Sequence, residues 1–192
     1  MTYPHLIGLS GKAGSGKDAA GEMLRRRGYV AMAFADPLKE ICALAFGYTA
    51  RHLHGDLKEV VDHRHGHAPR WLLQYLGTEV FRGIWPEIWV WHLEDRLRRH
   101  WAKEAPAAKP ASPPVVVTDV RFVDEAQMLR RLGAKLIRLE RDGAAAVNGI
   151  PGHCSETELD AWPQWDLVLQ GSLEEIEAAL GQWLAGDGEK AP

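Results

Sequence analysis

The sequence predicts an α/β fold of three layers, in which helices flank a parallel sheet on both faces. Three observations support this fold class. Short apolar runs of strand length alternate along the chain with amphipathic stretches of helical period. The apolar runs carry few charges, which is typical of parallel strands that are buried on both faces. The 192 residues are 46% hydrophobic and 26% charged, which predicts one domain over residues 1–192 with a substantial core.

The expected strands are apolar runs that end at charged or turn-forming residues. The first run ends in Gly-Leu-Ser and leads into a glycine-rich turn. The clearest run is β-branched and uncharged up to Asp119. In chain order, the strands are predicted over residues 5–10, 29–35, 115–122, 134–141 and 166–171.

Several of the expected helices carry start signals. Asp36 is a candidate N-cap, and Pro37 suits the first helical position because the N–H that it lacks has no helical partner there. Pro86 opens a later helix in the same way, and Ser172 with Glu175 forms a capping box. In chain order, the helices are predicted over residues 17–27, 36–46, 70–84, 86–101, 123–132 and 172–184.

Three further segments lack a regular period. Residues 47–69 are polar and histidine-rich, and we expect a loop with a short helix there. Residues 103–114 are rich in Ala and Pro, which predicts a linker that runs over the surface. Residues 186–192 are expected to be a frayed tail.

Composition excludes several classes of protein. The formal net charge of -3 argues against a protein that coats nucleic acid, which would carry a strong basic excess. Cys42 and Cys154 form no C-x-x-C pair, so neither a zinc knuckle nor a redox motif is expected. The N-terminus does not resemble a signal peptide, and no run approaches the roughly 18 apolar residues of a membrane span. We therefore expect a soluble, cytoplasmic protein.

The turn after the first strand fits the phosphate-binding pattern G-x-x-x-x-G-K from Gly11 to Lys17. Glycines let backbone N–H groups turn inward around an anion, and the helix that follows adds the positive end of its dipole. Lys17 then reaches the β- and γ-phosphates. The alternative is a glycine-rich turn without a ligand. The residues expected to bind the nucleotide are Gly11, Lys12, Ala13, Gly14, Ser15, Gly16, Lys17 and Asp18.

Two carboxylates, Asp18 and Asp119, are candidate ligands of Mg²⁺. Asp18 stands where the pattern normally has Ser or Thr, whose hydroxyl is a neutral ligand of the metal. A carboxylate there can hold the metal directly or through water, or it can simply favour the helix N-terminus. Asp119 is expected at the carboxyl end of a buried strand, where open parallel sheets bind their ligands. Its alternative role is to cap the following helix.

Five segments carry a resemblance to a known family: GKAGSGKD, FADPLKE, LLQYLGTEVFR, TDVRFVDEA and HCSE. Together they resemble the bacteriophage deoxynucleoside monophosphate kinases, which are P-loop nucleotide kinases, from Leu6 to about Leu180. That family carries Asp after the loop lysine, as this chain does. The resemblance implies a P-loop kinase fold with a mobile lid, and transfer of the γ-phosphate of ATP, with Mg²⁺, to a deoxynucleoside 5′-monophosphate. The cytoplasm would be that of the host cell if the chain is phage-encoded.

Transfer to a phosphate needs cations around two anions rather than a strong base, because the second pKa of the acceptor phosphate is about 6. Arg70 and Gln74 are four positions apart and share one helix face, which resembles the family's acceptor-binding stretch. A guanidinium can hold phosphate through two N–H groups, and Gln can pair with a base edge. For Arg70 and Arg82 the alternative is a solvated helix surface. Arg141 begins the expected lid.

The expected site draws on most of the chain. The acceptor-binding region is predicted over about 36–100 and the lid over about 141–157. The expected catalytic residues are Lys17, Asp119, Arg121 and Arg141. The expected substrate-binding residues are Asp36, Lys39, Arg70, Gln74, Arg82, Arg121, His153 and Glu156.

Other functions remain open. The same scaffold suits another small-molecule phosphate kinase, of the phosphomevalonate or dephospho-coenzyme A type, or a non-catalytic module that binds ATP. A guanine-reading Asn-Lys-x-Asp motif is absent, because Asn148 is followed by Gly149. The histidines of residues 52–67 match no standard zinc spacing, so we expect a solvated loop near the acceptor. Trp71 or Tyr75 is a candidate wall of the sugar pocket.

The expected partners are small molecules only, ATP and a deoxynucleoside monophosphate, with no nucleic acid and no membrane. The arginine runs at 96–99 and 130–131 are expected to be solvated helix faces. A homodimer surface is the alternative for both runs.

Overall fold

A computed structural model describes residues 5–102, 112–141, 149–150 and 152–187 of the chain. Its centre is a five-stranded sheet of order β2-β3-β1-β4-β5, in which all neighbouring strands are parallel. The strands are β1 (Leu6–Ser10), β2 (Val30–Met32), β3 (Val115–Val120), β4 (Lys135–Glu140) and β5 (Leu167–Gln170). The α/β fold class with a parallel sheet flanked by helices is therefore confirmed.

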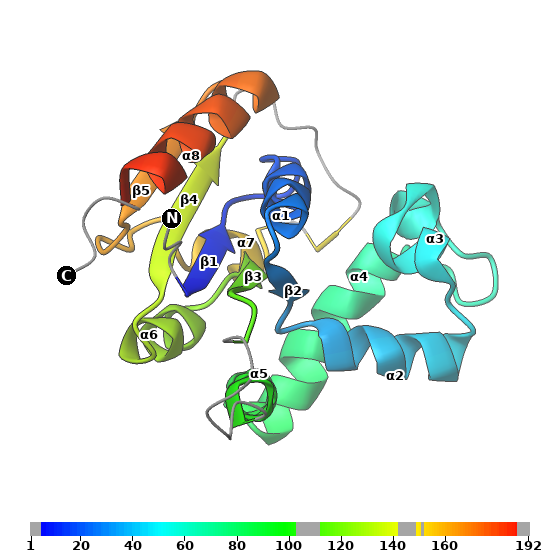
Figure 1. The fold of residues 1–192 in the computed structure, drawn as a ribbon. Coiled ribbons are helices and arrows are strands. Elements are labelled where there is room, and N and C mark those ends of the chain that lie inside the picture. The colour runs from blue at the N-terminus through cyan, green and yellow to red at the C-terminus, as the bar shows by residue number, and fades with distance from the viewer. Residues whose placement is uncertain (1–4, 103–111, 142–148, 151, 188–192) are drawn as a thin grey trace.

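Helices cover both faces of this sheet (Figure 1). In chain order, the helices of the described residues are α1 (Lys17–Arg26), α2 (Asp36–Phe46), α3 (Ala50–His54), η1 (Asp56–Glu59), α4 (Pro69–Gln74), η2 (Tyr75–Arg82), α5 (Ile88–Ala102), α6 (Val123–Arg131), α7 (Cys154–Thr157) and α8 (Leu173–Asp187). On one face α1 and α8 pack against the sheet, with Leu24 and Ile137 fully buried between them. On the other face α5 and α6 do so, with Leu97 and Val117 buried. Each such side chain contributes roughly 1.5–3 kcal/mol through its burial.

The helices α2, α3, η1, α4 and η2 form a separate group beside β2, which we call the helical lobe (Figure 1). The lobe shares the core of the α5 face, because Leu38 and Leu72 pack in the same cluster as Trp89 of α5. Residues that follow β1, residues at the end of β3 and residues of the lobe line one common cavity.

The lobe is more regular than the sequence predicts. The expected loop over residues 47–69 contains both α3 and the 3₁₀ helix η1. The single helix expected over residues 70–84 is instead a short α-helix followed by the π-helix η2. Within η2, the carbonyl of Gly77 accepts a hydrogen bond from the indole Nε1 of Trp89 at 2.9 Å, so a partner outside the helix helps to shape its wide turns.

Of the predicted helix-start signals, the capping box of α8 is confirmed and the N-cap of α2 is corrected. The capping box of α8 is present, with the Ser172 N–H donating to Glu175 at 2.7 Å and the Glu175 N–H donating to the Ser172 hydroxyl at 3.3 Å. The expectation that Asp36 is an N-cap is wrong, because Ala35 holds that position and Asp36 is already helical. The Asp36 carboxylate accepts the Ala33 N–H at 2.9 Å and pairs with another side chain, Arg96, at 2.7 Å.

Three expectations fall partly outside the described residues. Most of the linker over residues 103–114 and most of the first half of the lid lie there, as do residues 188–192 of the tail. Helix α8 itself continues through Asp187. Across the described ranges, none of the helices has both the length and the apolar character needed to span a bilayer.

Candidate active site

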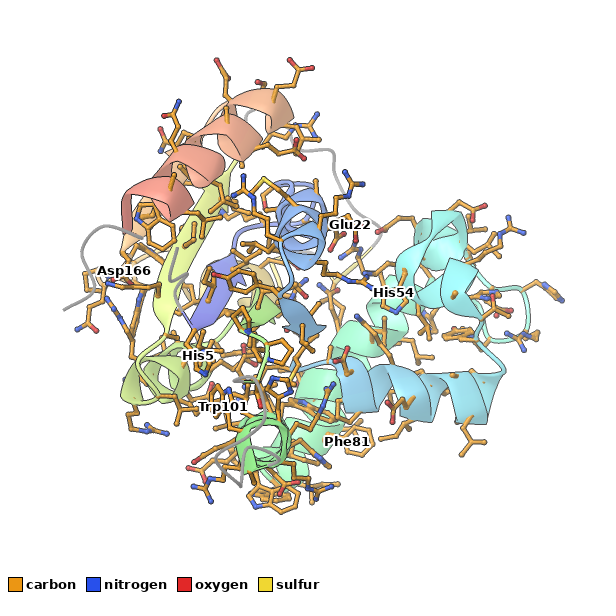
Figure 2. All side chains as sticks on the ribbon, in the orientation of Figure 1. His5, Glu22, His54, Phe81, Trp101 and Asp166 are labelled. Carbon is orange, nitrogen blue, oxygen red and sulfur yellow. The ribbon has the colours of Figure 1, made fainter. Side chains whose placement is uncertain are left out.

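The phosphate loop, the end of β3 and the helical lobe enclose a cavity of about 410 Å³. Figure 2 shows the two sides of this region, with Glu22 on α1 and His54 on the lobe. Six cationic side chains line the described cavity, against three carboxylates. The cations are Lys17, Lys39, Lys58, Arg70, Arg121 and Arg141, and the carboxylates are Asp18, Asp119 and Glu125. The cavity is therefore suited to anionic ligands.

The loop that follows β1 has the backbone of a phosphate-binding loop. Gly11, Gly14 and Gly16 have φ values of 146°, 79° and 92°, a region that disfavours other residues. A Cβ atom at Gly11 would lie 2.3 Å from the carbonyl oxygen of Leu139, so glycine is needed there. Helix α1 begins directly afterwards at Lys17, which directs its free N–H groups toward the cavity.

Lys17 is only 8% exposed. Its ammonium group donates hydrogen bonds to the carbonyl oxygens of Gly11 and Lys12, the second at 2.7 Å. Burial, with the charge of Arg121, lowers the pKa of Lys17 to about 7, although nearby carboxylates act in the opposite direction. A phosphate group beside this lysine would favour its charged form.

Asp119 has a structural task in addition to its position on the cavity wall. Its two carboxylate oxygens accept the N–H groups of Phe34 and Ala35, at 2.8 and 3.0 Å. These bonds tie the end of β3 to the segment that leads from β2 into α2. The alternative in which Asp119 caps the helix after β3 is wrong, because its oxygens bind this other segment.

Arg121 and Glu156 form an ion pair behind the phosphate loop. The other oxygen of Glu156 accepts the N–H of Ala13 at 3.1 Å. Arg121 also donates to the carbonyl oxygen of Ser155 at 3.3 Å. One carboxylate thus fixes both the loop and a cation that faces the cavity. Attraction to Arg121 lowers the pKa of Glu156 against the opposing effect of burial, so the carboxylate is ionised at neutral pH.

His153 and Gln74 lie at the part of the lid that the structure describes. The buried His153 ring caps α7 by accepting the Ser155 N–H at 3.2 Å, and it does not line the cavity. Gln74 does line the cavity, and its carbonyl oxygen accepts the Ile150 N–H at 2.7 Å. Gln74 therefore ties the segment expected to form the lid to α4, whereas His153 stabilises the start of α7 within that segment. Arg141 is exposed and lines the cavity, whereas residues 142–148 and 151 lie outside the described residues.

Arg82 and Asp36 are not among the residues that line the cavity. The Arg82 guanidinium pairs with Asp124 at 2.8 Å and with Glu125 at 3.0 Å, and it lies over the Phe122 ring. The expected direct contact of Arg82 with a substrate has no support in this arrangement. Instead, Arg82 holds Glu125, whose other oxygen accepts the N–H of Arg121 at 2.8 Å.

The part of the cavity formed by the helical lobe combines cations with an apolar wall. Lys39 and Arg70 line it as expected, and Arg70 pairs with Glu59. Lys58, on η1, also lines it, and the sequence analysis missed this residue. The only feature of the sequence that could have indicated its role was its position in the polar segment near the expected acceptor site. Neither Trp71 nor Tyr75 lines the cavity; the apolar wall is made by Phe34, Leu38, Leu73, Trp89 and Phe122.

Asp18 and Asp119 are the residues that could hold Mg²⁺. Both line the cavity, and Asp18 makes no hydrogen bond or ion pair within the described part of the chain. Proteins usually bind Mg²⁺ through one or two carboxylates together with substrate phosphates and water, so this donor set fits the metal. No cluster of three or more His, Cys, Asp or Glu side chains that could hold a metal by itself occurs among the described residues.

Comparisons with known proteins give one strong match. A protein of Acanthamoeba polyphaga mimivirus described as "Putative deoxynucleotide monophosphate kinase" is 36% identical over 176 residues, covering 85% of this chain and 86% of the relative. No family model matches the chain.

Two solved structures are similar at a lower level. TT1252 from Thermus thermophilus has a TM-score of 0.47 and 21% identity, covering 96% of this chain and 98% of its own. A gluconokinase from Sinorhizobium meliloti 1021 has a TM-score of 0.47 and 16% identity, covering 100% of both chains.

Proposed function

The chain belongs to the kinase family of the mimivirus relative, and we propose that it transfers the γ-phosphoryl group of ATP to a deoxynucleoside 5′-monophosphate. The products are ADP and the deoxynucleoside diphosphate. The resemblance seen in the sequence is thereby confirmed at the level of a P-loop kinase. Its bacteriophage origin stays a prediction, because the relative comes from a giant virus.

One observation carries the proposal: cations line a single cavity from separate parts of the fold. Lys17 and the loop N–H groups come from the phosphate loop and the start of α1, Lys39 and Arg70 come from the helical lobe, and Arg121 directly follows β3. A module that only binds ATP needs the first group and has no use for the second. Two phosphorylated ligands that meet end to end require both groups.

The donor end binds ATP through the residues of the phosphate loop. The N–H groups of residues 11–18 surround the β- and γ-phosphates, and the Lys17 ammonium leaves the loop carbonyls to contact them. Asp18 and Asp119 would hold Mg²⁺, which would neutralise phosphate charge when bound. If Asp18→Ala leaves the Mg²⁺ dependence of the rate unchanged, Asp18 is not a ligand of the metal.

The transfer itself needs no protein base. An oxygen of the acceptor phosphate attacks the γ-phosphorus of ATP, the bond from that phosphorus to the bridging oxygen of ADP breaks, and ADP leaves as an anion. Near neutral pH the acceptor is already mostly dianionic, since its second pKa is about 6. Arg121, fixed by Glu156, and Arg141 stabilise the charge that spreads over the transferring group.

The experiment is a coupled ADP-release assay with a panel of phosphate acceptors. We expect release that requires one or more of dAMP, dCMP, dGMP and dTMP. Release with only phosphomevalonate or dephospho-coenzyme A would move the chain to another phosphate kinase on the same scaffold. ATP binding without release for any acceptor would indicate a non-catalytic module.

A further inference from the structure

We infer that Lys58, carried by the short 3₁₀ helix η1, is a binding residue for the phosphate group of the acceptor. This inference rests on the proposed function and deepens it. It also gives a task to the histidine-rich segment over residues 47–69, which would present this lysine to the cavity.

The first support is that Lys58 has no carboxylate partner among the described residues. Lys58 lines the cavity, and no described carboxylate forms an ion pair with it. Its neighbour in sequence, Glu59, pairs with Arg70 instead. A partly buried ammonium without a carboxylate partner loses hydration and gains nothing in return, which is a costly arrangement for a purely structural lysine.

The second support is the charge of the groups around Lys58. Burial lowers the pKa of Lys58 to about 8, the charges of Arg70, Lys39 and Arg121 act in the same direction, and the carboxylate of Asp18 acts against them. Cations from η1, α2, α4 and the residue that follows β3 therefore line the same cavity close enough to repel one another, and an anion with two charges would relieve that repulsion.

The third support is the way in which η1 is held. The Glu59–Arg70 ion pair joins η1 to α4, and the N–H of Lys58 donates to the Gly55 carbonyl at 3.2 Å. Arg70 is thus shared between a protein carboxylate and the cavity, whereas Lys58 and Lys39 are not. Lys58 is accordingly the cation on η1 that remains available to a ligand.

The test compares binding of ligands that differ only in their phosphate. Lys58→Met, Lys58→Arg and the control Lys135→Met are titrated with dAMP, dCMP, dGMP and dTMP, with the matching deoxynucleosides, and with ADP. Lys135 is exposed and pairs with Asp166 at the far end of β4, away from the cavity. Circular dichroism and the melting temperature check that each variant is folded.

For Lys58→Met we expect the Kd of the bound monophosphate to rise by roughly 10- to 100-fold, as for loss of a hydrogen bond between charged groups. The Kd values of the deoxynucleoside and of ADP stay unchanged, Lys58→Arg retains most of the affinity, and Lys135→Met behaves as wild type. An unchanged monophosphate Kd in folded Lys58→Met overturns the inference, and so does an equal loss for ADP, which would assign Lys58 to the donor.

The proposed function and the inference about Lys58 are overturned by different results. If the wild type binds monophosphates but turns none of them over, the proposed function falls, while the Lys58 titration still decides the inference. If it turns them over and Lys58→Met binds them normally, only the inference falls. If it binds none of the four, both fall.

Discussion

The carboxylate of Glu156 accepts the backbone N–H of Ala13 at 3.1 Å, although the two residues lie 143 positions apart. The same carboxylate pairs with Arg121 at the end of β3. The HCSE segment near the C-terminus therefore braces the phosphate loop near the N-terminus. A displacement of this carboxylate would disturb the donor loop and a cavity cation together.

Glu156→Gln should lower both activity and stability. The amide keeps the shape of the side chain but leaves the Arg121 guanidinium without its counter-charge, which costs about 1.5–3 kcal/mol for a hydrogen bond to a charged group. We expect kcat to fall by roughly 10- to 100-fold, measured by ADP release. Glu22→Gln on α1, where the carboxylate pairs only with exposed arginines, is the matched control. A normal kcat in Glu156→Gln would show that the brace is not needed.

Asp119→Asn should destabilise the fold even without ligands. An amide has a single carbonyl oxygen, so only one of the Phe34 and Ala35 N–H groups keeps an acceptor. We expect the free energy of unfolding to fall by about 1–3 kcal/mol in a urea titration. Asp18→Asn is the control, because Asp18 makes no hydrogen bond or ion pair within the described residues. Equal stability of the two variants would contradict the structural task of Asp119.

ATP binding should take up a proton at Lys17. In the ligand-free protein its pKa is about 7, and bound phosphates raise that pKa. Above pH 7 the free lysine is mostly neutral and must gain a proton to bind, so ATP affinity should fall as the pH rises, by at most about tenfold per pH unit. Calorimetry at pH 8 in two buffers of different ionisation enthalpy measures this uptake directly. Equal binding heats in both buffers would mean that no proton is taken up.

Arg82→Met should act through stability rather than through substrate contact. The change removes the guanidinium that bonds both Asp124 and Glu125. Burial raises the pKa of Glu125 to about 8, so the loss is that of hydrogen bonds to a charged group rather than of a full buried ion pair, about 1.5–3 kcal/mol. The double variant Arg82→Met with Glu125→Gln should recover part of this loss, as measured by denaturant unfolding. If Arg82→Met instead raised only the KM for the acceptor and left stability intact, direct binding would be the better explanation.

Local patterns in the sequence predicted the parts of the site that local chemistry determines. The strand, glycine loop and helix from Leu6 to Arg26 follow from an apolar run and glycine spacing, and the structure has them as expected. Arg70 and Gln74 share the cavity because one short helix places them there. The relative positions of residues on one helix follow from its local geometry, so they can be predicted without the rest of the fold.

The features of the site that the sequence did not predict depend on contacts between residues that are far apart in the chain. The partners of Arg82 lie 42 and 43 positions away, so its helix position alone could not show that it faces α6 rather than the cavity. Lys58 reaches the cavity only because the segment around it folds into η1 against α4. The π-helix carries a hydrogen bond from the indole of Trp89, a contact that no helical period in the sequence encodes.

Following the phosphoryl group itself shows directly whether the chain phosphorylates deoxynucleoside monophosphates. ATP labelled at the γ-phosphate is mixed with each unlabelled deoxynucleoside monophosphate, and the products are separated. The account predicts label in a deoxynucleoside diphosphate with the wild type, and almost none with a folded Lys17→Met variant. Label that appears only as inorganic phosphate, or that reaches the diphosphate equally well without the Lys17 ammonium, would contradict it.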